Sequence, residues 1–245
     1  MLRTILILGG SAEAQALAGA LAGRPGLKGI TALAGRTAQP RRPAGALRIG
    51  GFGGAEGLAD YLRAERIAAV VDATHPFAAR MGWNAAQACA AAGVPLLRLE
   101  RPAWLRQPGD VWDEVEDWAA AVDRLRTGAR RVLLALGRQE LAPFAALTEI
   151  WFLIRSVQAP EPWPPFAQAE FLPARGPFSV ADERALLLEH GIDTLVCKNS
   201  GGPTGAKLEA ARALGLRVVM RRRPPRPETA RADGVDQALA WLERL

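Results

Sequence analysis

The chain has 245 residues, a length that fits one large domain or two small ones. It is 49% hydrophobic and 23% charged, which excludes a disordered chain, and it has no uncharged apolar run of about 18 residues, which excludes a transmembrane helix. Its formal net charge of +6 leaves three classes of partner open, namely nucleic acid, an anionic membrane surface and small polyanionic ligands.

The first half of the chain alternates short β-branched runs with alanine-rich helical stretches. This pattern predicts strands at 3–8, 29–34, 46–49, 67–73 and 94–99, and helices at 12–22, 55–65 and 76–92. The run 67–73 is continuously apolar, which is typical of a parallel strand buried on both faces. The βα alternation predicts a parallel sheet.

A stretch that contains prolines and a glycine, at 100–110, predicts a boundary, and a second alternation follows it. Strands are predicted at 132–136, 150–157, 167–172, 194–198 and 216–221, and helices at 138–147, 179–190, 204–214 and 233–245. We therefore predict an α/β fold with two Rossmann-like parallel-sheet domains, at 1–105 and 106–245. Ligands bind at the carboxyl ends of parallel strands, so we expect the active site in the cleft between the two domains.

The turn after the first predicted strand reads Gly9-Gly10-Ser11-Ala12-Glu13 and opens the first helix. Rossmann-type proteins bind a pyrophosphate at this position, because glycines let it approach the backbone and the helix N-terminus offers N–H groups. Ser11 either adds a hydroxyl donor to the phosphate or only caps the helix. The place of the turn in an alternating fold favours phosphate.

The loop after the second predicted strand carries Gly35, Arg36 and Thr37. An NAD site usually has an acidic residue here that holds the ribose 2′-hydroxyl, and this loop has none. A guanidinium suits a 2′-phosphate, which indicates NADP. The alternative is a solvated basic loop.

Two further loops follow predicted strands in the first half. The run Gly50–Gly54, which includes Gly51, either admits a ligand closely or is a flexible turn. Asp72, Thr74 and His75 end the most apolar strand, where ligands bind in α/β sheets. His75 is predicted to contact a ligand or donate a proton, and a structural histidine is the alternative.

The second half has two comparable loops. Gly137 and Arg138 follow one strand and open a helix, and the segment from Lys198 to Lys207 follows another. The latter offers amine, amide, hydroxyl and backbone donors, which suits an anion. Cys197, just before it, is interpreted as a buried core residue rather than a nucleophile.

The charge excess lies in the first half: residues 1–110 carry 13 basic and 7 acidic side chains, and residues 111–245 carry 18 of each. With basic side chains in loops and no aromatic–basic stripe, this distribution of charge favours a phosphorylated dinucleotide over nucleic acid as the ligand.

The two cysteines make neither a disulfide framework nor a metal set, which favours the reducing cytoplasm. The first apolar run is too short for a signal peptide, so export is not expected.

Together these loops resemble the precorrin-6A reductase family of cobalamin biosynthesis. The resemblance is carried by residues 7–14, 34–37, 50–54, 72–78, 137–138 and 198–202. The strings Asp-Ala-Thr-His-Pro-Phe-Ala and Lys-Asn-Ser-Gly-Gly are the most specific. Ser11 stands where threonine is common in the family, and the hydroxyl is kept.

The resemblance implies an oxidoreductase that transfers a hydride from NADPH to a ring-D double bond of precorrin-6A and gives precorrin-6B. The expected partner is this polycarboxylate macrocycle, and other enzymes of the pathway are allowed; no metal, nucleic acid or membrane is expected. Two alternatives stay open. One is a cobalt-precorrin-6A reductase that uses NADH or NADPH, and the other is a non-catalytic NADP-binding sensor.

The resemblance also implies roles for the loop residues. The proton that accompanies the hydride comes from His75, Lys198 or water. The residues expected to bind the cofactor are Gly9, Gly10, Ser11, Ala12, Glu13, Gly35, Arg36, Thr37, Gly51, Asp72 and Thr74. Those expected to bind the substrate are Pro76, Phe77, Gly137, Arg138, Asn199, Ser200, Gly201, Gly202 and Lys207.

Overall fold

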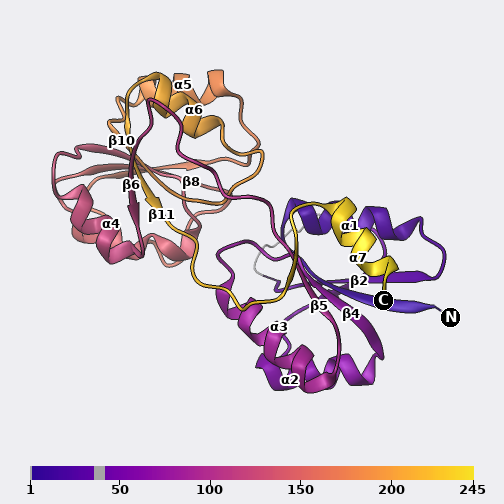
Figure 1. The fold of residues 1–245 in the computed structure, drawn as a ribbon. Helices are drawn as coiled ribbons and strands as arrows, with labels where there is room; N and C mark the ends of the chain where they lie inside the picture. The colour runs from indigo at the N-terminus through magenta and orange to yellow at the C-terminus, as the bar shows by residue number, and fades with distance from the viewer. Residues whose placement is uncertain (1, 36–41) are drawn as a thin grey trace. The chain divides into compact units, whose positions relative to one another are not determined.

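The structure is a computed structural model, and it describes residues 2–35 and 42–245. The chain divides into two units (Figure 1): unit 1 consists of 1–102 and 224–245, and unit 2 of 103–223. Each unit has a six-stranded sheet in which every described pair of neighbours is parallel. In the described part of the chain, no helix is long and apolar enough to cross a membrane.

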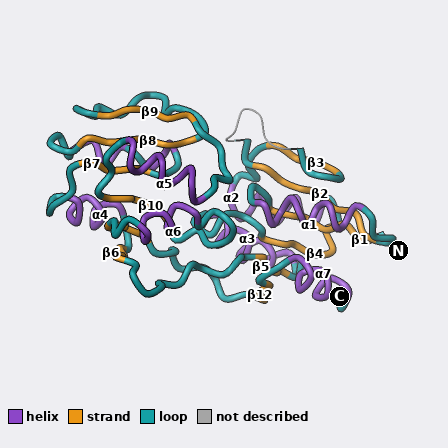
Figure 2. The backbone as a smooth tube through the Cα atoms, turned by 90° about the horizontal axis from the view of Figure 1, so that it is seen from above, coloured by secondary structure: helices purple, strands orange, loops and turns teal. Residues whose placement is uncertain are grey.

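Unit 1 has the strand order β12-β5-β4-β1-β2-β3, which can be followed in Figure 2. One face of the sheet packs on α1 and α7, and the other packs on α2 and α3. The elements are β1 (Arg3–Leu8), α1 (Ala12–Ala22), β2 (Leu27–Leu33), β3 (Ala46–Ile49), α2 (Gly54–Ala64), β4 (Ile67–Asp72), α3 (Ala79–Ala92), β5 (Leu96–Leu99), β12 (Ala230–Ala232) and α7 (Val235–Glu243).

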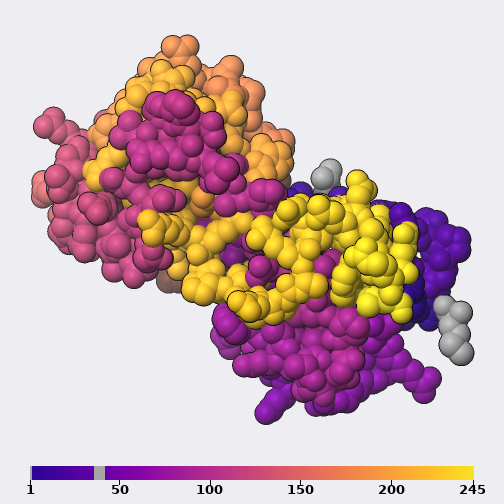
Figure 3. All heavy atoms as spheres, viewed as in Figure 1, coloured from indigo at the N-terminus to yellow at the C-terminus, as the bar shows by residue number. Residues whose placement is uncertain are grey.

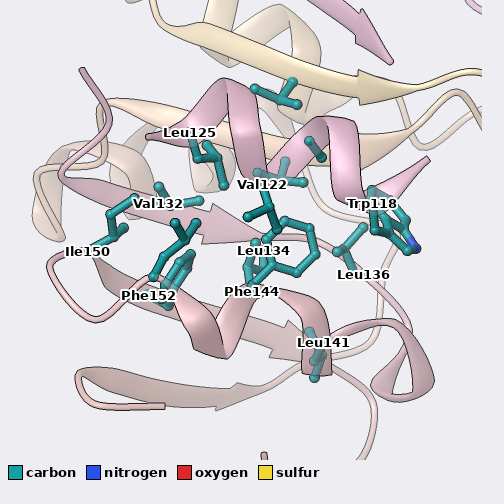
Figure 4. Close-up of a cluster of buried hydrophobic side chains, with 14 of the residues drawn as sticks. Trp118, Val122, Leu125, Val132, Leu134, Leu136, Leu141, Phe144, Ile150 and Phe152 are labelled. Atoms are coloured by element: carbon teal, nitrogen blue, oxygen red, sulfur yellow. The ribbon is translucent and has the colours of Figure 1, made fainter. Parts of the chain in front are cut away.

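Unit 2 has the strand order β6-β11-β10-β7-β8-β9. Its elements are β6 (Val111–Val115), α4 (Trp118–Leu125), β7 (Arg131–Leu134), the short 3-10 helices η1 (Arg138–Glu140) and η2 (Ala142–Ala146), β8 (Trp151–Ser156), β9 (Ala169–Pro173), α5 (Val180–Glu189), β10 (Thr194–Lys198), α6 (Ala206–Ala213) and β11 (Arg217–Arg221). On one face of the sheet, α4 and η2 form a core in which the rings of Trp118 and Phe144 meet edge to face (Figure 4). The other face packs on α5 and α6.

The predicted boundary at 105/106 is close to the observed one, but the assignment of the whole C-terminal part to the second domain differs from the structure. Residues 224–245 belong to unit 1. In Figure 3 this yellow segment lies against the N-terminal part of the chain. β12 pairs with β5, and α7 buries Ala238 and Leu242 in the core beneath α1. The chain therefore returns to complete the first sheet.

Two predicted helices also differ. The helix predicted from Pro76 begins at Ala79, because the preceding residues form a hydrogen-bonded turn in which the Ala78 amide donates to the His75 carbonyl (2.7 Å). The helix predicted at 138–147 consists of η1 and η2. Pro143 lies in the first turn of η2, where its missing N–H is tolerated, and it would break a longer helix.

We predict that the core beneath α7 is needed for the stability of unit 1. Leu242 is fully buried, so Leu242→Ala should lower the free energy of unfolding by about 2–5 kcal/mol. The matched control is Leu245→Ala, because Leu245 is 51% exposed and its truncation should change this value by less than about 0.5 kcal/mol. Urea unfolding followed by circular dichroism measures both. Equal effects would show that α7 does not stabilise this core.

Candidate functional site

The loops singled out in unit 1 gather at the carboxyl edge of its sheet. β1, β2, β3 and β4 are parallel neighbours and end at this edge. A cavity of about 90 Å³ lies there. Its lining comes from all four following loops and from α3: Leu8, Gly9, Ala32, Leu33, Ala34, Gly50, Gly51, Phe52, Gly54, Thr74, Met81 and Asn84. Predicted site residues from three separate loops, Gly9, Gly51 and Thr74, thus line one cavity.

The first turn is held tightly against the sheet. The Gly9 amide donates to the Ala32 carbonyl (2.9 Å), and a Cβ on Gly9 would lie 2.8 Å from Thr31 Cγ2, so only glycine fits. Gly10 has a φ of +112°, which also favours glycine. The turn therefore lies close to the sheet, and α1 begins beside the cavity.

Ser11 is the N-cap of α1. Its hydroxyl accepts from the Ala14 amide (3.1 Å) and donates to the Ala73 carbonyl (2.6 Å), which joins the loops after β1 and β4. The capping interpretation is confirmed, and the hydroxyl hydrogen is already directed at a protein oxygen. A phosphate contact by Ser11 stays a prediction.

Glu13, in the first turn of α1, forms an ion pair with Arg101 (2.8 Å), and both side chains are mostly buried. A carboxylate in the first turn suits the helix dipole but would repel a phosphate bound there. Arg101 offsets that repulsion by neutralising the carboxylate. Arg101 was not predicted, because it lies in the stretch interpreted as a boundary.

The second predicted loop is described only in part. Ala34 lines the cavity, and Gly35 has a φ of +73°. Arg36 and Thr37 lie outside the described residues.

The glycine run after β3 is held by Arg48, which no sequence motif marks. The Arg48 guanidinium lies 3.9 Å from the centre of the Phe52 ring and donates to the carbonyls of Gly50 (2.7 Å) and Gly51 (2.9 Å). The Gly50 amide donates to the Leu33 carbonyl (2.9 Å), which ties this loop to the end of β2. The run is thus a fixed wall of the cavity rather than a flexible turn.

The loop after β4 is organised around a buried carboxylate. Asp72 is 3% exposed, and its Oδ1 accepts from both the Thr74 amide (3.1 Å) and the Thr74 hydroxyl (2.6 Å). Its Oδ2 accepts from Arg226 Nη2 (2.5 Å). Asp72, predicted to bind the cofactor, is therefore held by protein groups, whereas Thr74 lines the cavity.

The His75 ring is oriented by its own loop. Its Nδ1 accepts from the Phe77 amide (3.2 Å), and its ring lies 5.8 Å from that of Phe77. An Nδ1 that accepts an N–H bond carries no proton, so the neutral ring is protonated on Nε2. His75 therefore presents Nε2–H as its donor.

In unit 2, the loops after β7 and β10 meet at Glu140. Lys198 Nζ lies 2.5 Å from Glu140 Oε2, and Arg221 Nη1 lies 3.6 Å from Oε1. Arg138 precedes this carboxylate in η1, after Gly137. Glu140 and Arg221 were not predicted, although both lie at the carboxyl ends of strands or just beyond, where the other candidates were found.

The Lys198–Gly202 loop is fixed by Trp104. The Asn199 amide accepts from the Trp104 N–H (2.8 Å) and donates to the Trp104 carbonyl (3.0 Å), and the indole N–H donates to the Gly202 carbonyl (3.0 Å). Arg223 donates to the carbonyls of Asn199 (3.0 Å) and Ser200 (3.2 Å). The Asn199 amide thus binds protein, and its contact with substrate stays a prediction.

Two other residues near this loop are buried. Lys207 donates to the Thr204 carbonyl (2.6 Å) and lies 4.5 Å from the centre of the Trp104 ring, so it stabilises the loop from beneath. Burial raises the pKa of the Cys197 thiol to about 11, so it is protonated at neutral pH. Cys197 is a core residue, as predicted.

The candidates thus form two sets, one in each unit. The set of unit 1 surrounds a glycine-lined cavity beside the start of α1, and the set of unit 2 places Lys198 and Arg221 around one carboxylate. The first set has the features of a dinucleotide site, and the second can pair with anions. The expectation that both sets share one cleft stays a prediction.

Comparisons with known proteins agree with these features. A family model described as "Precorrin-6x reductase CbiJ/CobK" matches residues 4–243. A "Precorrin-6A reductase" of Rhodococcus erythropolis is 52% identical over 98% of each chain. A "Cobalt-precorrin-6A reductase" of Priestia megaterium is 29% identical over 69% of this chain and 70% of its own. The solved structure "CobK precorrin-6A reductase" has a TM-score of 0.93 at 43% identity and covers 99% of this chain and 97% of that one.

These findings confirm the two Rossmann-like α/β domains and the resemblance that the loop sequences carry. The chain therefore belongs to the precorrin-6x reductase CbiJ/CobK family and is an oxidoreductase.

Proposed function

We propose that this protein reduces a ring-D double bond of precorrin-6A with NADPH and gives precorrin-6B. The observation that carries the proposal is the glycine-lined cavity beside the first turn of α1, in a chain of a reductase family. The higher identity to the relative named precorrin-6A reductase than to the one named for the cobalt form supports the cobalt-free substrate. The two buried free cysteines are in keeping with the cytoplasm as its compartment.

At about 90 Å³ the cavity holds only part of a dinucleotide, and its glycine lining suits the pyrophosphate end. A Cβ at Gly10 or Gly51 would meet no atom within 4 Å, so the backbone at both positions is open to close approach. The first N–H groups of α1 have no acceptor within the helix and carry its positive dipole end, which suits a pyrophosphate. The cofactor, when bound, supplies the hydride.

The preference for NADPH follows from the sequence after β2. Ala34 and Gly35 continue into Arg36 and Thr37, with no acidic residue to accept bonds from a ribose 2′-hydroxyl. A guanidinium forms charge-assisted bonds with a 2′-phosphate.

A hydride added to one carbon of a double bond requires a proton on the other carbon. His75 is our candidate for the donor because the Phe77 amide fixes its proton on Nε2. A neutral imidazole that gives up this proton would leave an anion, so His75 donates as the imidazolium, with a proton on Nδ1 in place of the Phe77 bond. The Nε2 proton goes to the substrate carbon, the neutral ring remains, and solvent supplies the next proton after turnover. Lys198 and water are the alternatives.

The anion-binding set of unit 2 suits the carboxylates of the macrocycle. Lys198 and Arg221 share the single carboxylate of Glu140, so this group keeps an excess of positive charge that can attract a further carboxylate beside it. We propose that acetate or propionate groups of the substrate pair with these two cations. Glu140 keeps both side chains oriented before substrate arrives.

The wild-type enzyme should oxidise NADPH only when precorrin-6A is added. The measurement is the loss of nicotinamide absorbance with purified precorrin-6A, and the controls are the enzyme with NADPH alone and with the cobalt-containing macrocycle. Oxidation with the cobalt form alone would contradict the proposed substrate. NADPH binding with no oxidation under any of these conditions would indicate a sensor.

Arg36→Ala should raise the KM for NADPH by roughly 10–100-fold and leave the KM for NADH unchanged, because one charge-assisted bond to phosphate is worth about 1.5–3 kcal/mol. Steady-state kinetics with both cofactors measures the difference. Arg63→Ala is the matched control, since the Arg63 side chain is 52% exposed on α2. Equal effects on the two cofactors would exclude a 2′-phosphate contact.

His75→Ala should lower kcat by about 10²–10⁴-fold, the usual contribution of a general acid, with the Kd for NADPH nearly unchanged. The Kd is measured by fluorescence titration and kcat by the absorbance assay. The other histidine, His190, caps the C-terminal end of α5 in unit 2, so His190→Ala is the control and should keep normal turnover. Normal turnover in His75→Ala would leave Lys198 or water as the proton source.

A further inference from the structure

We infer that Arg226 is a positioning residue for the reductase: its guanidinium sets the conformation of the loop from Asp72 to Phe77, which carries Thr74 and His75. The inference deepens the proposed function, because it rests on that loop being part of the site. Arg226 reaches the loop from the C-terminal segment of the chain, more than a hundred residues later in the sequence.

The guanidinium bridges the two ends of the loop. Nη2 donates to Asp72 Oδ2 (2.5 Å) at the end of β4, and Nη1 donates to the carbonyl of Pro76 (3.2 Å). A longer contact runs from Nη1 to the carbonyl of His75 (3.4 Å). Two nitrogens of one planar group therefore fix the separation between Asp72 and the backbone beside His75.

Asp72 transmits this restraint to the cavity. One of its oxygens binds Arg226, and the other accepts both bonds from Thr74, which lines the cavity. The side chains of Arg226 and Asp72 are 6% and 3% exposed, so the pair is hardly screened by solvent. A displaced Arg226 would leave a buried carboxylate unpaired and the Thr74 bonds without a fixed acceptor.

The Arg226 guanidinium packs directly against α3 at Gly82. A Cβ on Gly82, in the first turns of α3, would lie 2.6 Å from both Nε and Nη2 of Arg226. A glycine inside a helix is less favourable than alanine by about 1 kcal/mol, so Gly82 lowers the stability of α3 but leaves room for the Arg226 guanidinium. Gly82 therefore offers a way to move the guanidinium without removing its charge.

The residues that follow Arg226 in the C-terminal segment are bound to β5. Arg98 Nη1 donates to the carbonyl of Pro227 (3.2 Å), and β12 then pairs with β5, with Arg231 opposite Arg98. Within the described residues, Nε of Arg226 is buried and has no hydrogen-bond partner. The contacts between the guanidinium and the loop therefore come from its two terminal nitrogens.

Histidine NMR tests this inference without any use of enzyme activity. The chain has two histidines, His75 in the loop and His190 in unit 2, so labelled histidine gives one probe and one internal reference. Wherever the wild-type His75 ring is neutral, its proton should lie on Nε2. The spectrum of His75→Ala assigns the two sets of signals.

Three variants displace the guanidinium in different ways. Arg226→Ala removes it, Arg226→Lys keeps the charge but cannot bridge two acceptors in the same plane, and Gly82→Ala pushes it aside. All three should shift the His75 ring signals and leave those of His190 in place. The matched controls are Arg231→Ala, an exposed arginine of β12, and Gly19→Ala, a helical glycine with open space around it. Both controls should reproduce the wild-type spectrum.

Kinetics then tests whether the restraint matters for turnover. Arg226→Ala should lower kcat by about 10²-fold, as a misplaced loop does, and millimolar guanidinium should restore part of the loss. Arg226→Lys should lie between Arg226→Ala and wild type and should not respond to guanidinium. A general loss of folding would lower the thermal melting temperature and would not be rescued.

The outcomes separate this inference from the proposed function. Unchanged His75 signals in a folded Arg226→Ala protein would overturn the inference, whatever the enzyme does with NADPH. Where Arg226→Ala does not fold, the signals of Gly82→Ala and Arg226→Lys decide in the same way. Shifted signals with wild-type kcat would also overturn it, because the loop conformation would then not matter for turnover. Absence of wild-type turnover would contradict the proposed function alone.

Discussion

Parallel pairing of strands is the constraint on which the candidate site of unit 1 depends. In a parallel sheet every strand ends at the same edge, so the loops after β1, β2, β3 and β4 meet although they are far apart in the sequence. Two cross-links then hold the loops in register: Ser11 donates to the Ala73 carbonyl, and Gly50 donates to the Leu33 carbonyl. The cavity therefore results from the sheet topology and from a few hydrogen bonds between loops. Because glycines have no side chain, a ligand in the cavity can approach the backbone closely.

Several polar side chains that look like ligand contacts in the sequence are used inside the protein. Asn199 binds the backbone of Trp104, Lys207 binds the Thr204 carbonyl, and Asp72 binds Thr74 and Arg226. A loop at the carboxyl edge of a sheet has no neighbouring strand to satisfy its backbone, so side chains must fix it. A motif in such a loop consequently mixes residues that meet the ligand with residues that hold the loop, and residue type alone does not separate them.

The sequence predicts most of the regular elements whose pattern is local, although β6 and α4 were missed. The continuous apolar run of β4 and the helix predicted at 179–190, which is α5, are examples, and Cys197 is buried as predicted. β12 has only three residues, Ala-Arg-Ala, and it pairs with a strand far earlier in the chain, so no local pattern marks it. Glu140, Arg48 and Arg226 were missed for the same reason: each acts through a contact that depends on the tertiary fold. Nothing in the arginine- and proline-rich run 221–227 distinguishes Arg226 from its neighbours, although its side chain is only 6% exposed.

The buried pair of Arg226 and Asp72 shows how stability and geometry can be separated. Removing two charges from water costs several kcal/mol per ion, and the Coulomb attraction and hydrogen bonds of a buried pair often only balance that cost. Such a pair is poor evidence for stability, but it is strongly directional, because a misaligned pair leaves the desolvation energy of each buried charge uncompensated. In this fold the Arg226–Asp72 pair connects the segment just before β12 to the loop that carries Thr74 and His75. The return of the C-terminal segment thus completes the core and also places Arg226 where its planar guanidinium contacts both ends of that loop.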